Sequence, residues 1–97
     1  MLDKIKQLME VKRQAEQIKR ELEDTTMEIN DVNGIKIAIN GAQKFQSVEI
    51  ADSLINVVHK EKLEHDLLKS INAAVVKSQN AAAQKMKEIT GLNIPGL

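Results

Sequence analysis

Two histidines are the first residues in this 97-residue sequence to consider for catalysis. His59 and His65 lie six positions apart, which on a helix turns them roughly 120° away from each other. A helical zinc or base–nucleophile pair needs a spacing of three or four. Asp66 follows His65, but without a Ser or Cys fixed by a turn they form no triad. We therefore interpret both histidines as surface residues.

Other catalytic signals are also missing from the sequence. There is no Cys, which excludes thiol catalysis and thiolate metal sites, and the four Gly do not form a phosphate-binding loop. We therefore predict that the protein is not an enzyme and has no cofactor, no metal and no small-molecule substrate.

Basic residues with a regular spacing are stronger candidates for chemistry. Lys6, Arg13 and Arg20 recur every seven positions, and so do Lys12 and Lys19. On a helix they form two stripes on the side away from the apolar residues. Such rows could contact the phosphates along a DNA strand, and each contact would release a counterion.

Acidic residues between the stripes support a second interpretation. Glu10, Glu16 and Glu23 run between the basic rows, and Glu16 has the spacing of a helical ion pair with Arg20. A solvated face held by salt bridges has the same pattern. Taken alone, the residues favour this solvated face.

The segment from Lys69 onward carries more basic charge. Its basic residues, set against Glu88, are Lys69, Lys77, Lys85 and Lys87. Their spacing distributes them around a helix, and lysines near a helix C-terminus also complement its dipole. Because Phe45 is the only aromatic residue, stacking on single strands is disfavoured. We therefore expect salt-sensitive contacts to a duplex backbone with little sequence selectivity.

Composition limits the class of protein. Apolar residues make up 42% of the chain and charged residues 29%, and 14 Lys and Arg balance 14 Asp and Glu. The chain can fold, but no overall charge draws it to nucleic acid or membrane. Without an apolar run of membrane-spanning length or a secretory signal, we expect a cytoplasmic protein. Its small size favours a partner subunit.

Hydrophobic periodicity predicts the elements that position these residues. Residues 1–24 read as a helix with one narrow apolar seam formed by Leu8, Val11, Ala15, Ile18 and Leu22. Residues 25–58 read as a three-stranded antiparallel meander, because two Asn-Gly dipeptides separate runs rich in β-branched residues. Residues 59–90 read as a second helix, and 91–97 as a tail. The prediction is one α+β domain over 1–97, with the order α-β-β-β-α.

Several details of this fold are also predicted. Asn33-Gly34 can supply a type I′ hairpin turn, and Asn40-Gly41 marks the second turn. Phe45 has the opposite parity from Val48, so it either caps the other face of the sheet or follows a bulge. The small residues of 73–83 predict close packing of the second helix against the sheet or a symmetry mate.

The sequence resembles the YbaB/EbfC family of bacterial nucleoid-associated proteins over nearly its whole length. A charged, Gln- and Lys-rich first helix is followed by NGIKIAINGAQKFQSVEIADSLI and then by LEHDLLKSINAAVVKSQNAAAQKMKEITGLNIPGL. The order and spacing of these pieces carry the resemblance. The sequence lacks the Gly- and Met-rich lead-in common before the family's first helix, and its tail is short of glycine.

This resemblance implies a homodimer joined through its sheets, with projecting helices that bind and bend duplex DNA at the nucleoid. The family's charged helix positions correspond to Lys12, Arg13, Lys19, Arg20, Lys77, Lys85 and Lys87 in this sequence. Together with Lys6 from the stripe pattern, they are the candidate DNA-binding residues. The alternative is a homodimeric protein-interaction module for which DNA is incidental.

Overall fold

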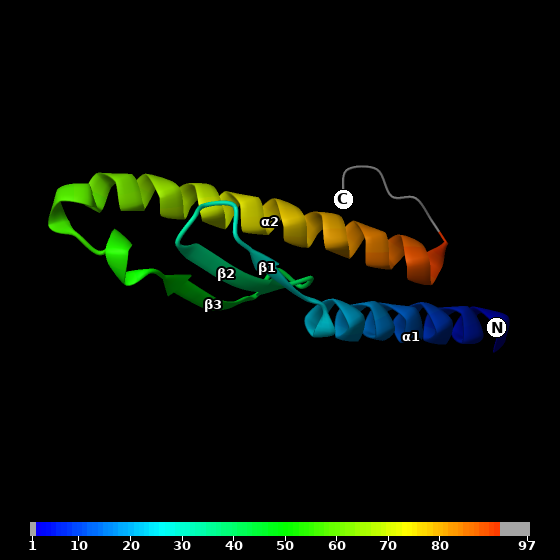
Figure 1. Cartoon of the computed structure of the whole chain (residues 1–97). Helices are drawn as coiled ribbons and strands as arrows, with labels where there is room; N and C mark the ends of the chain where they lie inside the picture. Colours follow the sequence, from blue (N-terminus) through cyan, green and yellow to red (C-terminus); the bar gives the residue numbers. More distant parts are fainter. Residues whose placement is uncertain (1, 92–97) are drawn as a thin grey trace.

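The computed structural model describes residues 2–91 and has the predicted order α-β-β-β-α. Its elements are α1 (Leu2–Asp24), β1 (Thr26–Ile29), β2 (Ile35–Asn40), β3 (Phe45–Ile50), short 3₁₀ helices at Asp52–Leu54 and Val57–His59, and α2 (Lys60–Thr90). The molecule measures 68 × 22 × 17 Å. In Figure 1, α2 crosses the sheet and continues beside α1. Of the predicted tail, 92–97 lie outside the described residues.

The sheet is the predicted antiparallel meander, with strand order β1-β2-β3. A bulge interrupts the pairing of β2 with β3, because Ala38 pairs with Ser47 while Ile39 pairs with Phe45. The extra residue, Gln46, restores Phe45 to a position opposite Ile39. Of the two alternatives for the parity of Phe45, the bulge is the one the structure shows.

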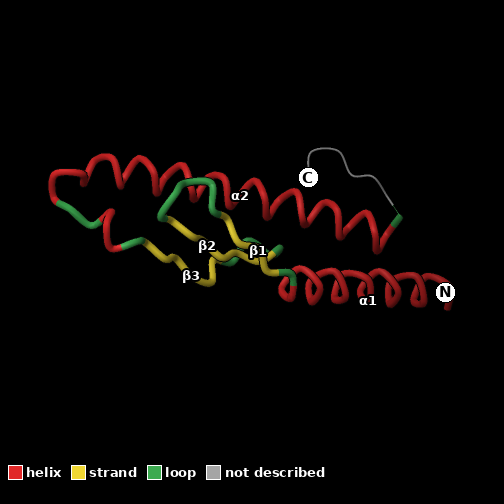
Figure 2. Tube along the Cα trace, in the orientation of Figure 1, coloured by secondary structure: helices red, strands yellow, loops and turns green. Residues whose placement is uncertain are grey.

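Four isoleucines on one face of the sheet form the core together with α2. Ile29, Ile35, Ile37 and Ile39 are buried and cluster with Ala74 of α2. They come from alternate positions of their strands, so they share one face. Tube and cartoon views show α2 lying across this sheet (Figures 1 and 2).

Small residues allow α2 to lie close to the sheet. Ser70, Ala74 and Ser78, each four positions apart, are all buried. Both hydroxyls have acceptors, since Ser70 donates to the Asp66 carbonyl at 2.9 Å and Ser78 to the Asn40 carbonyl at 2.8 Å. The predicted close packing against the sheet is therefore confirmed.

The first turn differs from its predicted geometry, whereas the second turn begins at Asn40-Gly41 as predicted. Gly34 has φ +92° but Asn33 has no positive φ, so the type I′ prediction is wrong. A type I′ hairpin needs a two-residue loop, whereas five residues, 30–34, join β1 to β2. In the second turn the positive φ falls at Gln43, at +63°.

Asn40 connects that second turn to both helices. Its side-chain Oδ1 accepts hydrogen bonds from the backbone N–H groups of Ala42 and Lys44, each at 3.0 Å. Its Nδ2 donates to the Glu23 carbonyl in the last turn of α1 at 3.3 Å, and its own carbonyl accepts from Ser78 of α2. Asn40 is only 4% exposed, so its own polar groups depend on these protein partners more than on water.

Gly41 completes this junction through its backbone. Its N–H donates to the carbonyls of Leu22 and Thr25, both at 2.9 Å. A Cβ on Gly41 would lie 3.1 Å from the Leu22 oxygen. The turn therefore contacts the end of α1 backbone to backbone, and a side chain at position 41 would press on the Leu22 backbone. We call Asn40 and Gly41 with these partners the Asn40–Gly41 junction.

The predicted apolar seam of α1 is covered unevenly within one chain. Leu8 and Val11 are 70% and 63% exposed, whereas Ile18 and Leu22, in the second half, are partly buried. Only the second half of the predicted seam is covered within one chain. The first half stays uncovered because the sheet and its junction contact α1 only near its end.

Replacing Asn40 tests the junction. Asn40→Ala removes the acceptor of the Ala42 and Lys44 N–H groups and the bond to the Glu23 carbonyl, so we expect a loss of about 1–3 kcal/mol in the free energy of unfolding. Asn33→Ala is the control, because Asn33 is exposed, and it should change stability by less than about 0.5 kcal/mol. Urea unfolding at equal protein concentration measures both variants. If Asn40→Ala were as stable as the control Asn33→Ala, the Asn40 side chain would add no stability through the junction.

Candidate nucleic-acid interface

The candidate basic residues lie mainly where α1 and the C-terminal half of α2 run side by side (Figure 1). Five of the candidate residues are exposed and have neither an ion pair nor a side-chain hydrogen bond within residues 2–91: Lys6, Lys12, Lys19, Arg20 and Lys87. The α1 members extend outward because apolar side chains occupy other positions around the helix. No acidic side chain within residues 2–91 pairs with these cations, so they are available to a ligand.

Arg13 is already paired with an acid. Its Nη2 lies 2.5 Å from Glu10 Oε1, and its Nε donates to Oε2 at 3.0 Å. These hydrogen bonds, together with the charge of Arg13, lower the pKa of Glu10. Because this is an exposed pair, a phosphate can compete for the guanidinium, but Glu10 must first be displaced.

Two of the candidate lysines on α2 already have partners, so they are less available to a ligand than the five unpaired cations. The Lys85 side chain is 35% exposed, and its Nζ lies 3.7 Å from a Glu88 carboxylate oxygen. Lys77 donates to the Glu28 carbonyl of β1 at 3.3 Å. Lys77 also precedes Lys85 by eight residues, about 12 Å along the helix. The ammonium group of Lys77 is therefore held at β1, about two turns of α2 before Lys85.

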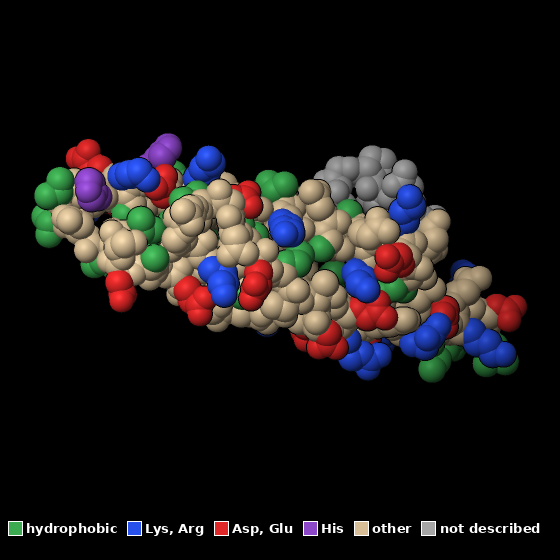
Figure 3. Space-filling model, in the orientation of Figure 1, with side chains coloured by type: hydrophobic (Ala, Val, Ile, Leu, Met, Phe, Trp, Pro, Cys, Tyr) green, Lys and Arg blue, Asp and Glu red, His purple; other side chains and the backbone are tan. Residues whose placement is uncertain are grey.

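Acidic side chains are mixed with the basic ones at this end of the molecule. Figure 3 shows Lys and Arg interleaved with Asp and Glu along the two helices. Glu16 and Arg20, which have the spacing of an ion pair, form none within the described part of the chain. The positive charge is therefore local to individual side chains, and a ligand must contact them closely to be attracted.

His59 and His65 are both exposed, as predicted. His59 lines an open cavity of about 210 Å³ together with Lys62 and Asp66, and Lys62 Nζ donates to Asp66 Oδ2 at 2.6 Å. No group of three His, Asp or Glu residues in 2–91 is placed to hold a metal ion. Sequence reasoning missed the Lys62–Asp66 pair, although its spacing of four is the signal that finds it.

Apolar side chains remain exposed beside the sheet. Phe45 and Val48 of β3 are 46% and 50% exposed, although they share the face that carries the isoleucine core. The reason is that α2 covers β1 and β2 more than β3. Leu68 of α2 is also exposed, and lies about half a turn around the helix from Lys77, which contacts β1. We call Phe45, Val48 and Leu68 the β3-side apolar surface.

Comparison with known proteins identifies related sequences. The profile of the YbaB/EbfC DNA-binding family matches residues 1–93. Similar proteins named nucleoid-associated protein come from Syntrophobacter fumaroxidans (36% identity over 64 residues, 65% of this chain and 58% of that protein) and Caldicellulosiruptor bescii (29% over 63 residues, 65% and 56%). Another, from Prochlorococcus marinus, is 34% identical over 70 residues, 69% of this chain and 60% of that protein.

These matches cover less than two thirds of each relative's length. Among the helices of residues 2–91, none combines the length and the apolar character that a membrane span needs.

The Lys62–Asp66 pair generates a prediction about pH. The hydrogen bond from Lys62 lowers the pKa of Asp66, so the pair stabilises the fold above the ordinary carboxyl pKa. That stabilisation disappears as the pH falls through the lowered pKa. Lys62→Met should therefore return the pKa of Asp66 towards its ordinary value, which an NMR titration of the carboxyl carbon measures. Lys60→Met is the control, because Lys60 pairs with Glu64 instead. An unchanged Asp66 titration in Lys62→Met would contradict this assignment.

Proposed function

Because the chain belongs to the YbaB/EbfC DNA-binding family, we propose that it binds duplex DNA as a homodimer without catalysing a reaction. It contacts the phosphate backbone with low sequence selectivity and alters the path of the DNA. The names of its relatives place this action at the nucleoid. The observation that carries the proposal is the set of exposed, unpaired cations where α1 and α2 lie side by side.

The dimensions of α1 suit a duplex. Its 23 residues extend over about 35 Å, close to one turn of B-DNA. Lys12 and Lys19 are seven positions apart, about 10 Å along the helix, so both can contact one phosphate strand. Phosphate contacts of this kind position a protein but carry no sequence information.

The candidate DNA-binding residues differ in how available their charges are to a ligand. Lys6, Lys12, Lys19, Arg20 and Lys87 are the primary contacts that we propose, because no acid occupies them. Arg13 and Lys85 contribute after they exchange Glu10 and Glu88 for phosphate. Lys77 contributes least, because its ammonium group already bonds to β1.

The β3-side apolar surface supports the homodimer. Phe45 and Val48 are exposed on the edge strand β3 and Leu68 is exposed on α2, and we propose that a second copy covers these apolar side chains. A two-fold dimer uses the same surface on both subunits. Two such subunits present two pairs of helices, one pair on each side of a bound duplex.

Salt dependence and charge reversal test DNA binding. We expect the affinity for random duplex to fall steeply with salt, with a log–log slope of about −0.9 per neutralised phosphate. Replacing both Lys12 and Lys19 by Glu should lower the affinity at least about tenfold and reduce the slope by about one unit per lost contact. Fluorescence anisotropy at several salt concentrations measures both quantities.

The matched control places the same charge change elsewhere. Lys60→Glu with Lys69→Glu alters the N-terminal half of α2, away from α1, and should leave most of the affinity intact. A nearly flat salt slope in the wild type would instead favour the protein-interaction module, for which the balanced charge of the chain is the supporting observation. An equal loss in both double variants would contradict the proposed contacts.

Placing a charge in the proposed dimer interface tests the dimer. Val48→Glu should weaken self-association by about 2 kcal/mol or more, roughly a 30-fold rise in dissociation constant. Val76→Glu is the control, because Val76 is similarly exposed, at 54%, but lies on the flank of α2 near β1. Sedimentation equilibrium measures the masses. A monomeric wild type, or a Val48→Glu dimer as tight as the wild type, would show that this surface is not the interface.

A further inference from the structure

The two Asn-Gly dipeptides of the chain have opposite environments. In such a dipeptide the Gly nitrogen can attack the Asn side-chain carbon, since no Cβ on the Gly obstructs it. From their environments we infer that Asn33 is a site of spontaneous deamidation in the folded protein, and that Asn40 is protected. Water is the only co-reactant, and the products are aspartate and isoaspartate.

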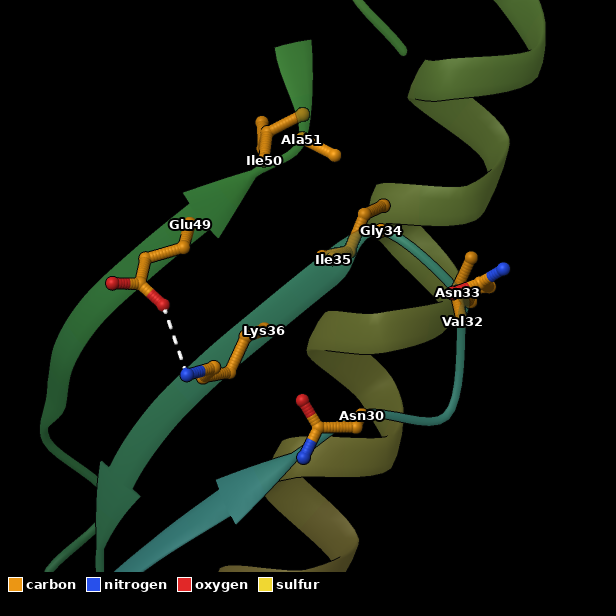
Figure 4. Close-up of a pocket in the computed structure, with 9 residues that line it drawn as sticks. All are labelled: Asn30, Val32, Asn33, Gly34, Ile35, Lys36, Glu49, Ile50 and Ala51. Atoms are coloured by element: carbon orange, nitrogen blue, oxygen red, sulfur yellow. Dashed lines mark ion pairs between the residues drawn. The ribbon is translucent and has the colours of Figure 1, made fainter. Parts of the chain in front are cut away.

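Asn33 has what the reaction requires. It is exposed in the loop between β1 and β2, and its side chain has no hydrogen-bond partner among residues 2–91. The N–H of Gly34 also has none in this part of the chain. Figure 4 shows Asn33 at the bend of the loop, beside an open cavity of about 360 Å³. The Gly34 nitrogen is therefore free to attack the Asn33 side-chain carbon, and water can reach both groups.

The reaction balances without an oxidant or reductant. The Gly34 nitrogen loses its proton to base and bonds to Cγ of Asn33, and the side-chain nitrogen leaves as ammonia. The five-membered succinimide then adds water, and one of its two ring C–N bonds breaks. Breaking one bond leaves aspartate, whereas breaking the other leaves isoaspartate, which has an extra methylene in the backbone.

The Asn40–Gly41 junction blocks the same reaction. The Gly41 N–H is held by two carbonyl acceptors at 2.9 Å, so deprotonation would sacrifice both bonds. The Asn40 amide is fixed by its bonds to Ala42, Lys44 and Glu23, which prevents Cγ from approaching the nitrogen. Reaction at Asn40 therefore requires local unfolding.

Deamidation at Asn33 would disturb a specific contact. The Gly34 carbonyl accepts from the Ala51 N–H at 2.8 Å, and Leu54 packs so closely that a Cβ on Gly34 would lie 2.8 Å from its Cδ1. These contacts hold the start of the connection from β3 to α2. Isoaspartate lengthens the backbone immediately before Gly34, so it displaces this carbonyl and loosens residues 51–54.

Ageing the full-length protein in mildly alkaline buffer tests the inference. Peptide mapping with an isoaspartate-specific methyltransferase should locate conversion at Asn33, at least about tenfold faster than at Asn40. In urea the two rates should become similar, because the junction is lost. Asn33→Gln is the control and should prevent the modification at this dipeptide, since glutamine forms the corresponding ring far more slowly.

Two results would overturn the inference. One is a folded protein in which Asn33 stays intact over the time in which the urea-unfolded chain converts. The other is conversion of Asn33 and Asn40 at equal rates in the folded state. Neither result depends on DNA binding, so the test is independent of the proposed function.

Discussion

The close approach of the Asn40–Gly41 turn to the end of α1 determines the shape of this molecule. The Asn40 side chain and the Gly41 N–H bond to the end of α1, and the lack of a Cβ at Gly41 allows this close approach. The Asn40 carbonyl accepts a hydrogen bond from Ser78 of α2. Without these contacts α1 would be held only by its packing against α2 and by the backbone at Thr25. The junction therefore sets which side chains of α1 lie beside α2, and through them which cations remain exposed.

A chain with balanced charge can still present cations that have no acidic partner. In α1 the spacing of three pairs Arg13 with Glu10, while Lys12, Lys19 and Arg20 have no such pair within 2–91. Net charge governs long-range attraction, whereas phosphate contact depends on individual side chains within a Debye length of the DNA. The proposed interface is of the second kind, which is consistent with weak sequence selectivity.

Sequence patterns predicted the fold well because periodicity reports local geometry. The alternating isoleucines, the Asn-Gly turns and the small residues of α2 all indicated elements that the structure contains. Other features depend on distant parts of the chain. Loop length made the type I′ assignment at Asn33-Gly34 wrong, and the limited reach of the sheet leaves Leu8 uncovered. Lys77 contacts β1 because α2 packs on the sheet. The spacing of residues along one helix does not predict how that helix packs against other elements.

The uninterrupted length of α2 has a mechanical consequence. Its 31 residues, about 46 Å, rest on the sheet at one end and accompany α1 at the other. A stiff rod supported near one end behaves as a lever arm, so a slight tilt over Ala74 moves the far tip by a larger distance. In the proposed dimer, the separation between the helices of the two subunits would therefore depend on side-chain volume around Ala74, far from the proposed DNA contacts.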